Sequence, residues 1–262
     1  MLSVNKKEVE LTSFPDNTLA FRYDAKEQRG NFLIEWRYDD ERECMALWYL
    51  VNHIRESQPT AKIMLDMPYL PNARMDRVKN TDEVFTLKWF ARFINGMWFD
   101  SVRIRDPHSN VGVALINRAQ ALGIADIVRE VTSKIPDASD LIYCFPDEGA
   151  TKKYSEQIKG EYVFGIKHRD WRTGAISELQ LNEGHKVNGK NVLIVDDICS
   201  RGGTFIFMAK ALKDAEAKQV YLYVTHCENT IFEGEILGTD LISRVFTTSS
   251  IFRGKHEKII VI

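Results

Sequence analysis

Short apolar runs alternate along the chain with stretches in which apolar residues recur every three or four positions. In the first half, the apolar runs predict strands at 19–23, 32–36, 62–66 and 102–105. Helical spacing predicts one helix between residues 39 and 59 and another from residue 82 to Gly96. A Pro-Asp-Asn sequence predicts a turn at 14–17. The first half is therefore expected to contain strands and helices in alternation.

The same alternation begins again after Gly123. Strands are predicted at 141–145, 162–166, 191–195 and 220–225, and helices at 151–158 and 204–214. Strand–helix alternation favours a mainly parallel sheet with helices on both faces. We therefore predict an α/β protein with two domains, residues 1–125 and 126–262.

Composition is consistent with an ordinary globular protein. The 262 residues leave room for two modest domains, and 44% are hydrophobic and 27% charged. A net charge of −2 gives no reason to expect a nucleic-acid partner. No apolar run approaches the ~20 residues of a membrane helix, and no signal peptide is recognisable. The cysteines lack metal-type spacing, so we expect reduced thiols in a cytoplasmic protein at Cys44, Cys144, Cys199 and Cys227.

Residues 191–204 carry the most specific pattern. An apolar strand leads to Asp196 and Asp197, and a short loop into a helix follows. This loop consists of Ser200, Arg201, Gly202, Gly203 and Thr204. Glycines let backbone N–H groups close on an anion, and the next helix N-terminus favours negative charge. The carboxylates would repel phosphate and fit sugar hydroxyls or a hydrated metal instead. The pattern predicts a ribose 5-phosphate site; the alternative is a solvated acidic turn.

Other polar clusters also follow predicted strands, where open parallel sheets bind their ligands. After 62–66, Arg74 and Arg77 flank Asp76 in a proline-stiffened loop. Two guanidinium groups can hold a polyphosphate. A solvated loop with a local ion pair is the alternative.

Two clusters offer metal ligands. After 102–105, His108 could ligate a divalent cation and Asp106 could orient its ring. After 141–145, a helix N-terminus with nearby lysines could hold a metal-bound pyrophosphate, with Asp147 as a metal ligand. This segment consists of Asp147, Glu148, Gly149 and Ala150, followed by Lys152 and Lys153. The alternatives are a surface histidine and a helix with acidic capping residues.

Basic residues follow the strand predicted at 162–166. Lys167, His168 and Arg169 lead into a polar stretch, 170–174, that we expect to form a mobile flap. Cations brought in by such a flap would stabilise charge on transferring phosphates and exclude water. A basic β-hairpin without a catalytic role is the alternative.

These segments resemble, in order, those of the ribose-phosphate pyrophosphokinases. The 191–204 loop resembles the phosphoribosyl-pyrophosphate motif of type I phosphoribosyltransferases. Residues 68–77 resemble the family's Pro-Tyr-aromatic-Pro-Tyr-Ala-Arg-Gln-Asp-Arg stretch. The family's Asp-x-His, Pro-Asp-x-Gly and Lys-Arg-Arg elements are matched at 106–108, 146–149 and 167–169. The turn at 14–17 resembles the family's adenine-contacting Phe-x-Asp/Asn-x-Glu turn.

The resemblance implies two phosphoribosyltransferase-like domains and a role for each segment. ATP would contact Phe14, Asp16, Arg74, Asp76, Arg77 and His108. Ribose 5-phosphate would contact Asp196, Asp197 and 200–204, and pyrophosphate the loop 147–150. His108 and Asp147 would ligate Mg²⁺, and Lys167 and Arg169 would be catalytic. Departures from the family pattern stand at Thr18, Met75, His168 and Arg201.

The implied reaction transfers the pyrophosphoryl group of ATP to the anomeric hydroxyl of ribose 5-phosphate and releases AMP. Family sites often borrow residues from a neighbouring subunit, so a homodimer or larger homo-oligomer is expected. Two alternatives stay open: a phosphoribosyltransferase, which would share the 196–204 loop, and a non-catalytic paralogue that regulates a true synthetase.

Overall fold

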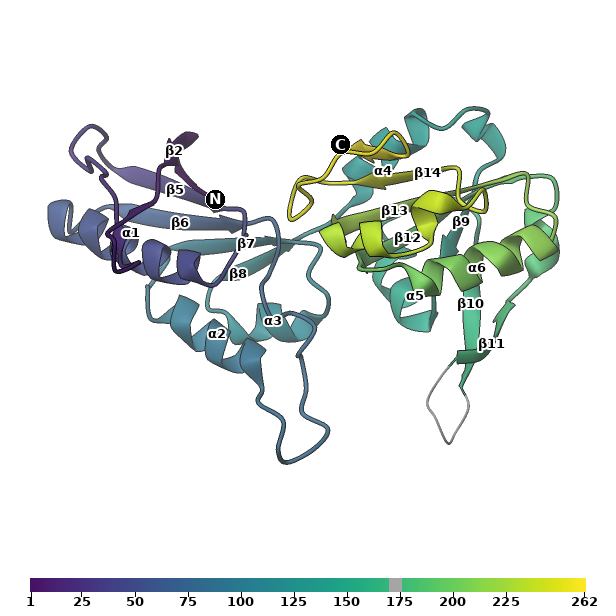
Figure 1. Ribbon diagram of the computed structural model, residues 1–262, viewed down its shortest axis with the longest axis horizontal. Helices are drawn as coiled ribbons and strands as arrows, with labels where there is room; N and C mark the ends of the chain where they lie inside the picture. The colour runs from purple at the N-terminus through teal and green to yellow at the C-terminus, as the bar shows by residue number, and fades with distance from the viewer. Residues whose placement is uncertain (170–175) are drawn as a thin grey trace. The chain divides into compact units, whose positions relative to one another are not determined.

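The computed structural model describes residues 1–169 and 176–262, and the side chains of 167–169 and 176–179 are also outside its description. The flap expected at 170–174 therefore lies outside the described residues. The chain divides into two compact units, Met1–Leu122 and Gly123–Ile262, each built around its own sheet (Figure 1).

Unit 1 contains a six-stranded sheet in the order β2-β1-β5-β6-β7-β8. Strands β5 to β8 are parallel, and β1 and β2 add an antiparallel edge. The strands are β1 (Leu2–Val4), β2 (Lys7–Val9), β5 (Asn31–Trp36), β6 (Lys62–Met67), β7 (Ser101–Arg105) and β8 (Ala119–Leu122). A separate hairpin pairs β3 (Thr12–Ser13) with β4 (Leu19–Ala20). The helices are α1 (Arg42–Ser57), α2 (Thr86–Asn95) and α3 (Asn110–Leu115).

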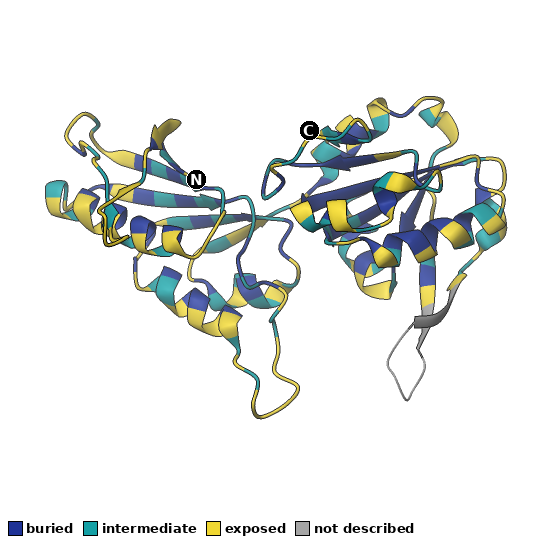
Figure 2. Ribbon diagram, in the orientation of Figure 1, coloured by how far each residue is buried: buried dark blue, intermediate teal, exposed yellow. Residues whose placement is uncertain are grey.

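The core of unit 1 lies between one face of this sheet and helices α1 and α2. Alternate residues of the central strands are buried, as period-two alternation requires for a sheet covered on one face. Phe32, Ile63 and Leu50 are among the fully buried side chains, each contributing about 1.5–3 kcal/mol. The intervening strand residues are mostly half-buried, visible as teal bands in Figure 2.

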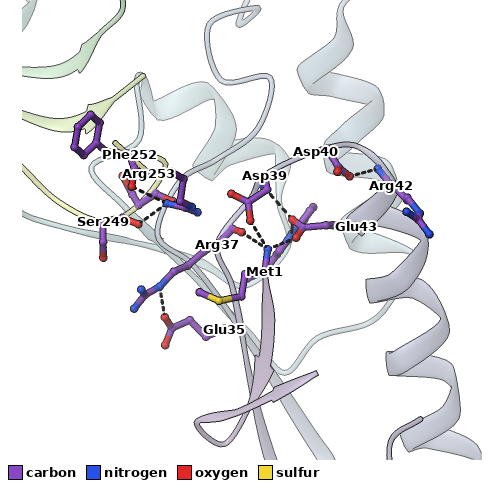
Figure 3. A network of polar contacts seen from close by, with 12 residues as sticks. Met1, Glu35, Arg37, Asp39, Asp40, Arg42, Glu43, Ser249, Phe252 and Arg253 are labelled. Carbon is purple, nitrogen blue, oxygen red and sulfur yellow. Dashed lines mark hydrogen bonds and ion pairs between the residues drawn. The ribbon is translucent and has the colours of Figure 1, made fainter. Parts of the chain in front are cut away.

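A polar network ties the start of α1 to β5 (Figure 3). Glu43 is buried, and its Oε2 accepts hydrogen bonds from Trp36 Nε1 at 2.9 Å and from the Asp39 N–H at 3.0 Å. The amino group of Met1 forms ion pairs with Asp39 and Glu43. Because the buried carboxylate is fully engaged, it fixes the helix instead of destabilising the core.

Unit 2 contains a seven-stranded sheet in the order β11-β10-β9-β12-β13-β14-β15, parallel except for β11. The strands are β9 (Ile142–Phe145), β10 (Tyr162–Arg169), β11 (Ile176–Leu181), β12 (Asn191–Cys199), β13 (Gln219–Cys227), β14 (Arg244–Thr247) and β15 (Ile259–Val261). The helices are α4 (Ala125–Ser133), α5 (Glu148–Tyr154) and α6 (Gly203–Asp214), with 3₁₀ turns η1 (Ala138–Asp140), η2 (Gly184–Val187), η3 (Asn229–Glu233) and η4 (Ile236–Gly238).

Both faces of this second sheet are covered. One buried cluster combines strand residues with α6, and the other combines them with α4 and α5. Val192, Leu193, Ile194 and Val195 are consequently all completely buried. The prediction of an α/β fold with mainly parallel sheets flanked by helices is confirmed.

Several predicted boundaries were wrong. The strand expected at 19–23 is only Leu19–Ala20, and the helix expected from residue 82 begins at Thr86. The helix expected at 151–158 begins at Glu148, because Asp147 caps it. The strand expected to stop at Val195 continues to Cys199, because its register with β13 continues. Within the described residues, no helix is long and apolar enough to cross a membrane.

Candidate active site

The carboxyl end of β12 holds the acidic pair of unit 2. Asp197 is buried and Asp196 is half-buried, and they lie within the strand, two and three residues before its end at Cys199. The Asp197 N–H donates to Asp196 Oδ1 at 2.9 Å. The pair is therefore held by the strand backbone and not by a flexible loop.

The charged form of Asp196 is unfavourable here, because the carboxyl is removed from solvent and lies next to another carboxylate. Burial raises the pKa of the Asp196 carboxyl well above its ordinary value, and the carboxylates of Asp197 and then Asp147 raise it further. Because β9 and β12 are parallel neighbours, Asp147 and Asp196 lie at the same edge of the sheet. A divalent cation or a set of hydroxyl donors would relieve this repulsion.

The loop after β12 is shaped by Gly202. Its φ is +80°, in the left-handed region that favours glycine. A Cβ at this position would lie 2.0 Å from Ile236 Cδ1, whereas a Cβ on Gly203 would meet nothing within 4 Å. Gly202 thus lets the loop pack against η4, and Gly203 faces open space at the N-terminus of α6. Helix geometry leaves the first N–H groups of α6 without intrahelical partners, an arrangement that accepts an anion.

Arg201 forms an ion pair with Glu233 that the sequence pattern does not predict. Its Nη2 lies 2.7 Å from Glu233 Oε2, and its Nε lies 3.1 Å from the same oxygen. Gly234 packs directly on the loop, since a Cβ there would lie 1.9 Å from the Arg201 carbonyl oxygen. Residues 233–236 therefore support the loop, and only their contacts in the fold identify them.

Asp147 acts as the N-cap of α5. Its Oδ1 accepts from the Ala150 N–H at 3.0 Å, and the Thr151 N–H bonds to its backbone carbonyl. The expected pyrophosphate loop, 147–150, is thus the cap and first turn of a helix. The capping bond uses one oxygen of the carboxylate expected to ligate a metal.

Lys167 and Arg169 lie in β10, whose end pairs with β11 as an antiparallel hairpin. The register shifts between His168 and Arg169. Their side chains lie outside the described residues, so their catalytic role stays a prediction.

In unit 1, the loop after β6 presents Arg74 and Arg77 to solvent. Arg77 Nε lies 3.4 Å from Asp76 Oδ1, and the Asp76 side chain is only 14% exposed while that of Arg77 is 76% exposed. The mostly buried acid therefore anchors an exposed guanidinium, as the sequence pattern suggested.

After β7, the backbone turns sharply before His108. Asp106 is buried with a φ of +44°, an uncommon conformation for a residue other than glycine. Its N–H bonds to the Leu122 carbonyl at 3.0 Å. Ser109 then caps α3 by accepting from the Val111 N–H, and His108 between them is exposed. The turn thus presents the imidazole at the carboxyl end of the sheet.

The turn at 14–17 joins β3 to β4 and leaves Phe14 60% exposed. Asp16 Oδ1 accepts from the N–H and the hydroxyl of Thr18, at 3.0 and 2.7 Å. These bonds lower the pKa of Asp16. Thr18, which departs from the family's Glu, therefore stabilises the turn together with Asp16.

Within the described residues, no group of three or more His, Cys, Asp or Glu side chains is arranged to hold a metal ion. Asp147 and Asp196 lie at the same edge of the unit 2 sheet, and His108 belongs to unit 1. The oxygen-rich donors fit Mg²⁺, which commonly uses one or two carboxylates together with substrate phosphates.

Comparisons with known proteins find similar sequences and a similar fold. A sequence model described as "Phosphoribosyl transferase domain" matches residues 116–239, which include the loops of unit 2. A ribose-phosphate pyrophosphokinase of Thermococcus kodakarensis is 29% identical over 84% of this chain and 77% of its own. One from Chlorobaculum tepidum is 26% identical over 91% of this chain and 74% of its own.

The chain is similar to the ribose-phosphate pyrophosphokinases. A crystal structure of phosphoribosylpyrophosphate synthetase from Mycobacterium smegmatis has the same fold, with a TM-score of 0.77 and 17% identity over 97% of this chain and 85% of that one. These similarities confirm the resemblance stated from the sequence. The roles of individual residues stay predictions.

Proposed function

We propose that this chain is a ribose-phosphate pyrophosphokinase that makes 5-phosphoribosyl 1-pyrophosphate and AMP from ATP and ribose 5-phosphate. The observation that carries the proposal is the arrangement at the carboxyl end of the unit 2 sheet. There, Asp147 and Asp196 lie at the ends of neighbouring parallel strands, beside a glycine loop that opens onto the α6 N-terminus. Such a site offers acceptors for sugar hydroxyls and donors for a 5-phosphate.

In the proposed reaction, the anomeric oxygen attacks the β-phosphorus of ATP, the bond to the α,β-bridging oxygen breaks, and AMP leaves with that oxygen. The hydroxyl proton passes to solvent, since the described residues include no clear general base. The 200–204 loop binds the 5-phosphate, Asp196 and Asp197 orient the ribose, and Lys167 and Arg169 stabilise charge on the transferring group.

We further propose that Arg74 and Arg77 bind the ATP phosphates and that Phe14 and Asp16 contact the base. Mg²⁺ would neutralise charge on the phosphates, with His108 and Asp147 among its ligands. The exposed Phe14 supports an oligomer in which this turn reaches a neighbouring subunit. The cysteines are free thiols, which fits a cytoplasmic enzyme.

The test is AMP release from ATP and Mg²⁺ with and without ribose 5-phosphate. We expect ribose-dependent AMP from the wild-type chain, and a loss of at least about a hundredfold in Lys167→Ala, as for removal of one stabilising donor. Lys186→Ala is the matched control, because Lys186 pairs with Glu183 on η2 and has no proposed role. No AMP from folded wild-type protein would overturn the proposal, and consumption of phosphoribosyl pyrophosphate with a base would favour the phosphoribosyltransferase alternative.

A further inference from the structure

The proposed phosphate loop, 200–204, is connected to the last residues of the chain by a single layer of contacts. Residues 228–239, which include η3 and η4, follow β13 and pack against this loop. They also contact residues 252–258, which lead into β15. The segment before β15 can therefore influence the loop although it lies some fifty positions away in the sequence.

Lys258 connects the start of β15 to η4. Its side chain is half-buried, and Nζ donates to the backbone carbonyl of Ile236 at 3.1 Å and to that of Thr239. Ile236 begins the turn and Thr239 is its C-cap, where carbonyl groups need partners from outside the turn. The carbonyl of Lys258 accepts from the Val245 N–H of β14 at 2.9 Å. The ammonium therefore ties η4 to the edge of the sheet.

The charge of Lys258 is engaged by these contacts. Burial of the ammonium lowers its pKa, because protein replaces part of the surrounding water. The carbonyls of Ile236 and Thr239 supply hydrogen bonds in place of that water. Removal of the ammonium would leave both carbonyls without this donor, so the position of η4 depends on it.

Ile236 carries the contact from η4 to the loop. Its side chain is fully buried and fills the space beside Gly202, where a Cβ would overlap it. Two residues earlier, Gly234 lies against the Arg201 carbonyl oxygen. Because close-packed groups transmit displacement, a shift of η4 would move the loop at these residues. The N–H groups of α6 that are proposed to bind the 5-phosphate follow immediately.

A second set of contacts fixes η3 to the same segment. The Phe232 ring stacks on Phe252 with the centroids 6.1 Å apart, and a Cβ on Gly254 would overlap the Phe232 ring. Asn229 Oδ1 accepts from the Arg253 N–H at 3.1 Å. The ammonium takes no part in these contacts, so η3 should stay in place when the ammonium is removed.

We propose that Lys258 is a positioning residue for the ribose 5-phosphate loop. Its ammonium sets the position of η4, the Ile236 side chain sets the backbone at Gly202, and the N–H groups that follow are aligned for the phosphate. The identity of the ligand rests on the proposed function, whereas the alignment is a property of the free protein.

The first test is amide hydrogen exchange of the full chain without ligand. In Lys258→Met, we expect exchange in η4 and 200–204 to be about tenfold faster, as for loss of a hydrogen bond to a charged group, with η3 unchanged. Lys258→Arg keeps a cationic donor and should restore most of the protection. Lys255→Met is the matched control, because Lys255 is an exposed lysine of the same segment. Loss of protection confined to β15, or spread evenly over unit 2, would overturn the proposal.

The second test is calorimetric titration with ribose 5-phosphate, in which Lys258→Met should weaken binding by about fivefold. The same substitution should have a smaller effect in an Ile236→Val background, because the proposed contact runs through Ile236 Cδ1. ATP affinity should not change, since the proposed ATP contacts belong to unit 1. Equal effects of Lys258→Met in the two backgrounds would overturn the proposal. A wild-type chain that bound no ribose 5-phosphate would overturn the proposed function, and hydrogen exchange would still decide whether Lys258 positions the loop.

Discussion

The adjacent glycines of the proposed phosphate loop, Gly202 and Gly203, should respond differently to replacement by alanine, one in stability and the other in ligand affinity. In Gly202→Ala, the new methyl group would lie 2.0 Å from Ile236 Cδ1, and the residue would keep a φ of +80°. The left-handed conformation costs about 1–2 kcal/mol, and overpacking adds about 1–3 kcal/mol. We therefore expect Gly202→Ala to destabilise unit 2 by about 2–5 kcal/mol, a large part of a typical domain's stability.

Gly203→Ala is the matched variant. Its methyl group would meet nothing within 4 Å, and alanine is a good helix residue at the start of α6. We expect unchanged or slightly increased stability but weaker binding of ribose 5-phosphate, since the methyl group would occupy space proposed for the phosphate. Gly202→Ala should lose stability, and Gly203→Ala should lose only affinity.

Hydrogen exchange of the amides in β12 and α6 measures the loss of stability in Gly202→Ala, since it reports the opening free energy of that region. Ile236→Val removes the clashing Cδ1, so it should recover part of the loss when combined with Gly202→Ala. Equal protection in the two glycine variants, or no coupling with Ile236→Val, would refute this account of the loop.

Three further predictions concern charge. Asp196→Asn should raise the free energy of unfolding at neutral pH without Mg²⁺, measured by urea denaturation. In the wild type, the raised pKa of Asp196 makes the protein less stable as pH increases from the ordinary aspartate range through the raised pKa. The same dependence of stability on pH in the variant would contradict this. Thr18→Ala should move the pKa of Asp16 upward in a ¹³C NMR titration, because the hydrogen bond from the Thr18 hydroxyl is lost while the one from its N–H remains. In the wild type, the stabilisation from these bonds is present above the unfolded pKa and disappears as pH falls through the folded pKa. Arg201→Ala should cost less than about 1 kcal/mol, because its ion pair with Glu233 is exposed.

The sequence predicted the parallel strands of unit 2 well, because Val192 to Val195 are buried on both faces and so are apolar without interruption. It also placed Asp147 and Asp196 at the ends of predicted strands, but that β9 and β12 are neighbours is seen only in the structure. It did not predict the continuation of β12 to Cys199, because polar residues there are held by pairing with β13. Strand length at this point depends on a neighbour and not on local composition.

Contacts between segments that are distant in the sequence could not be predicted from the sequence pattern. Arg201 meets Glu233, and Gly202 requires the space beside Ile236, yet nothing in the composition of 228–238 marks these residues as supports. The short strands β1 and β2 were also missed, since three residues are too few to establish a period. Local periodicity identifies strands and helices, whereas the shape of the site depends on packing.

³¹P NMR of a single reaction mixture tests the central claim most directly. With ATP, Mg²⁺ and ribose 5-phosphate, we expect the three ATP signals to decrease while AMP and a sugar diphosphate ester appear in equal amounts. Formation of ADP and a ribose bisphosphate would show transfer of the γ-phosphoryl group alone and would contradict it.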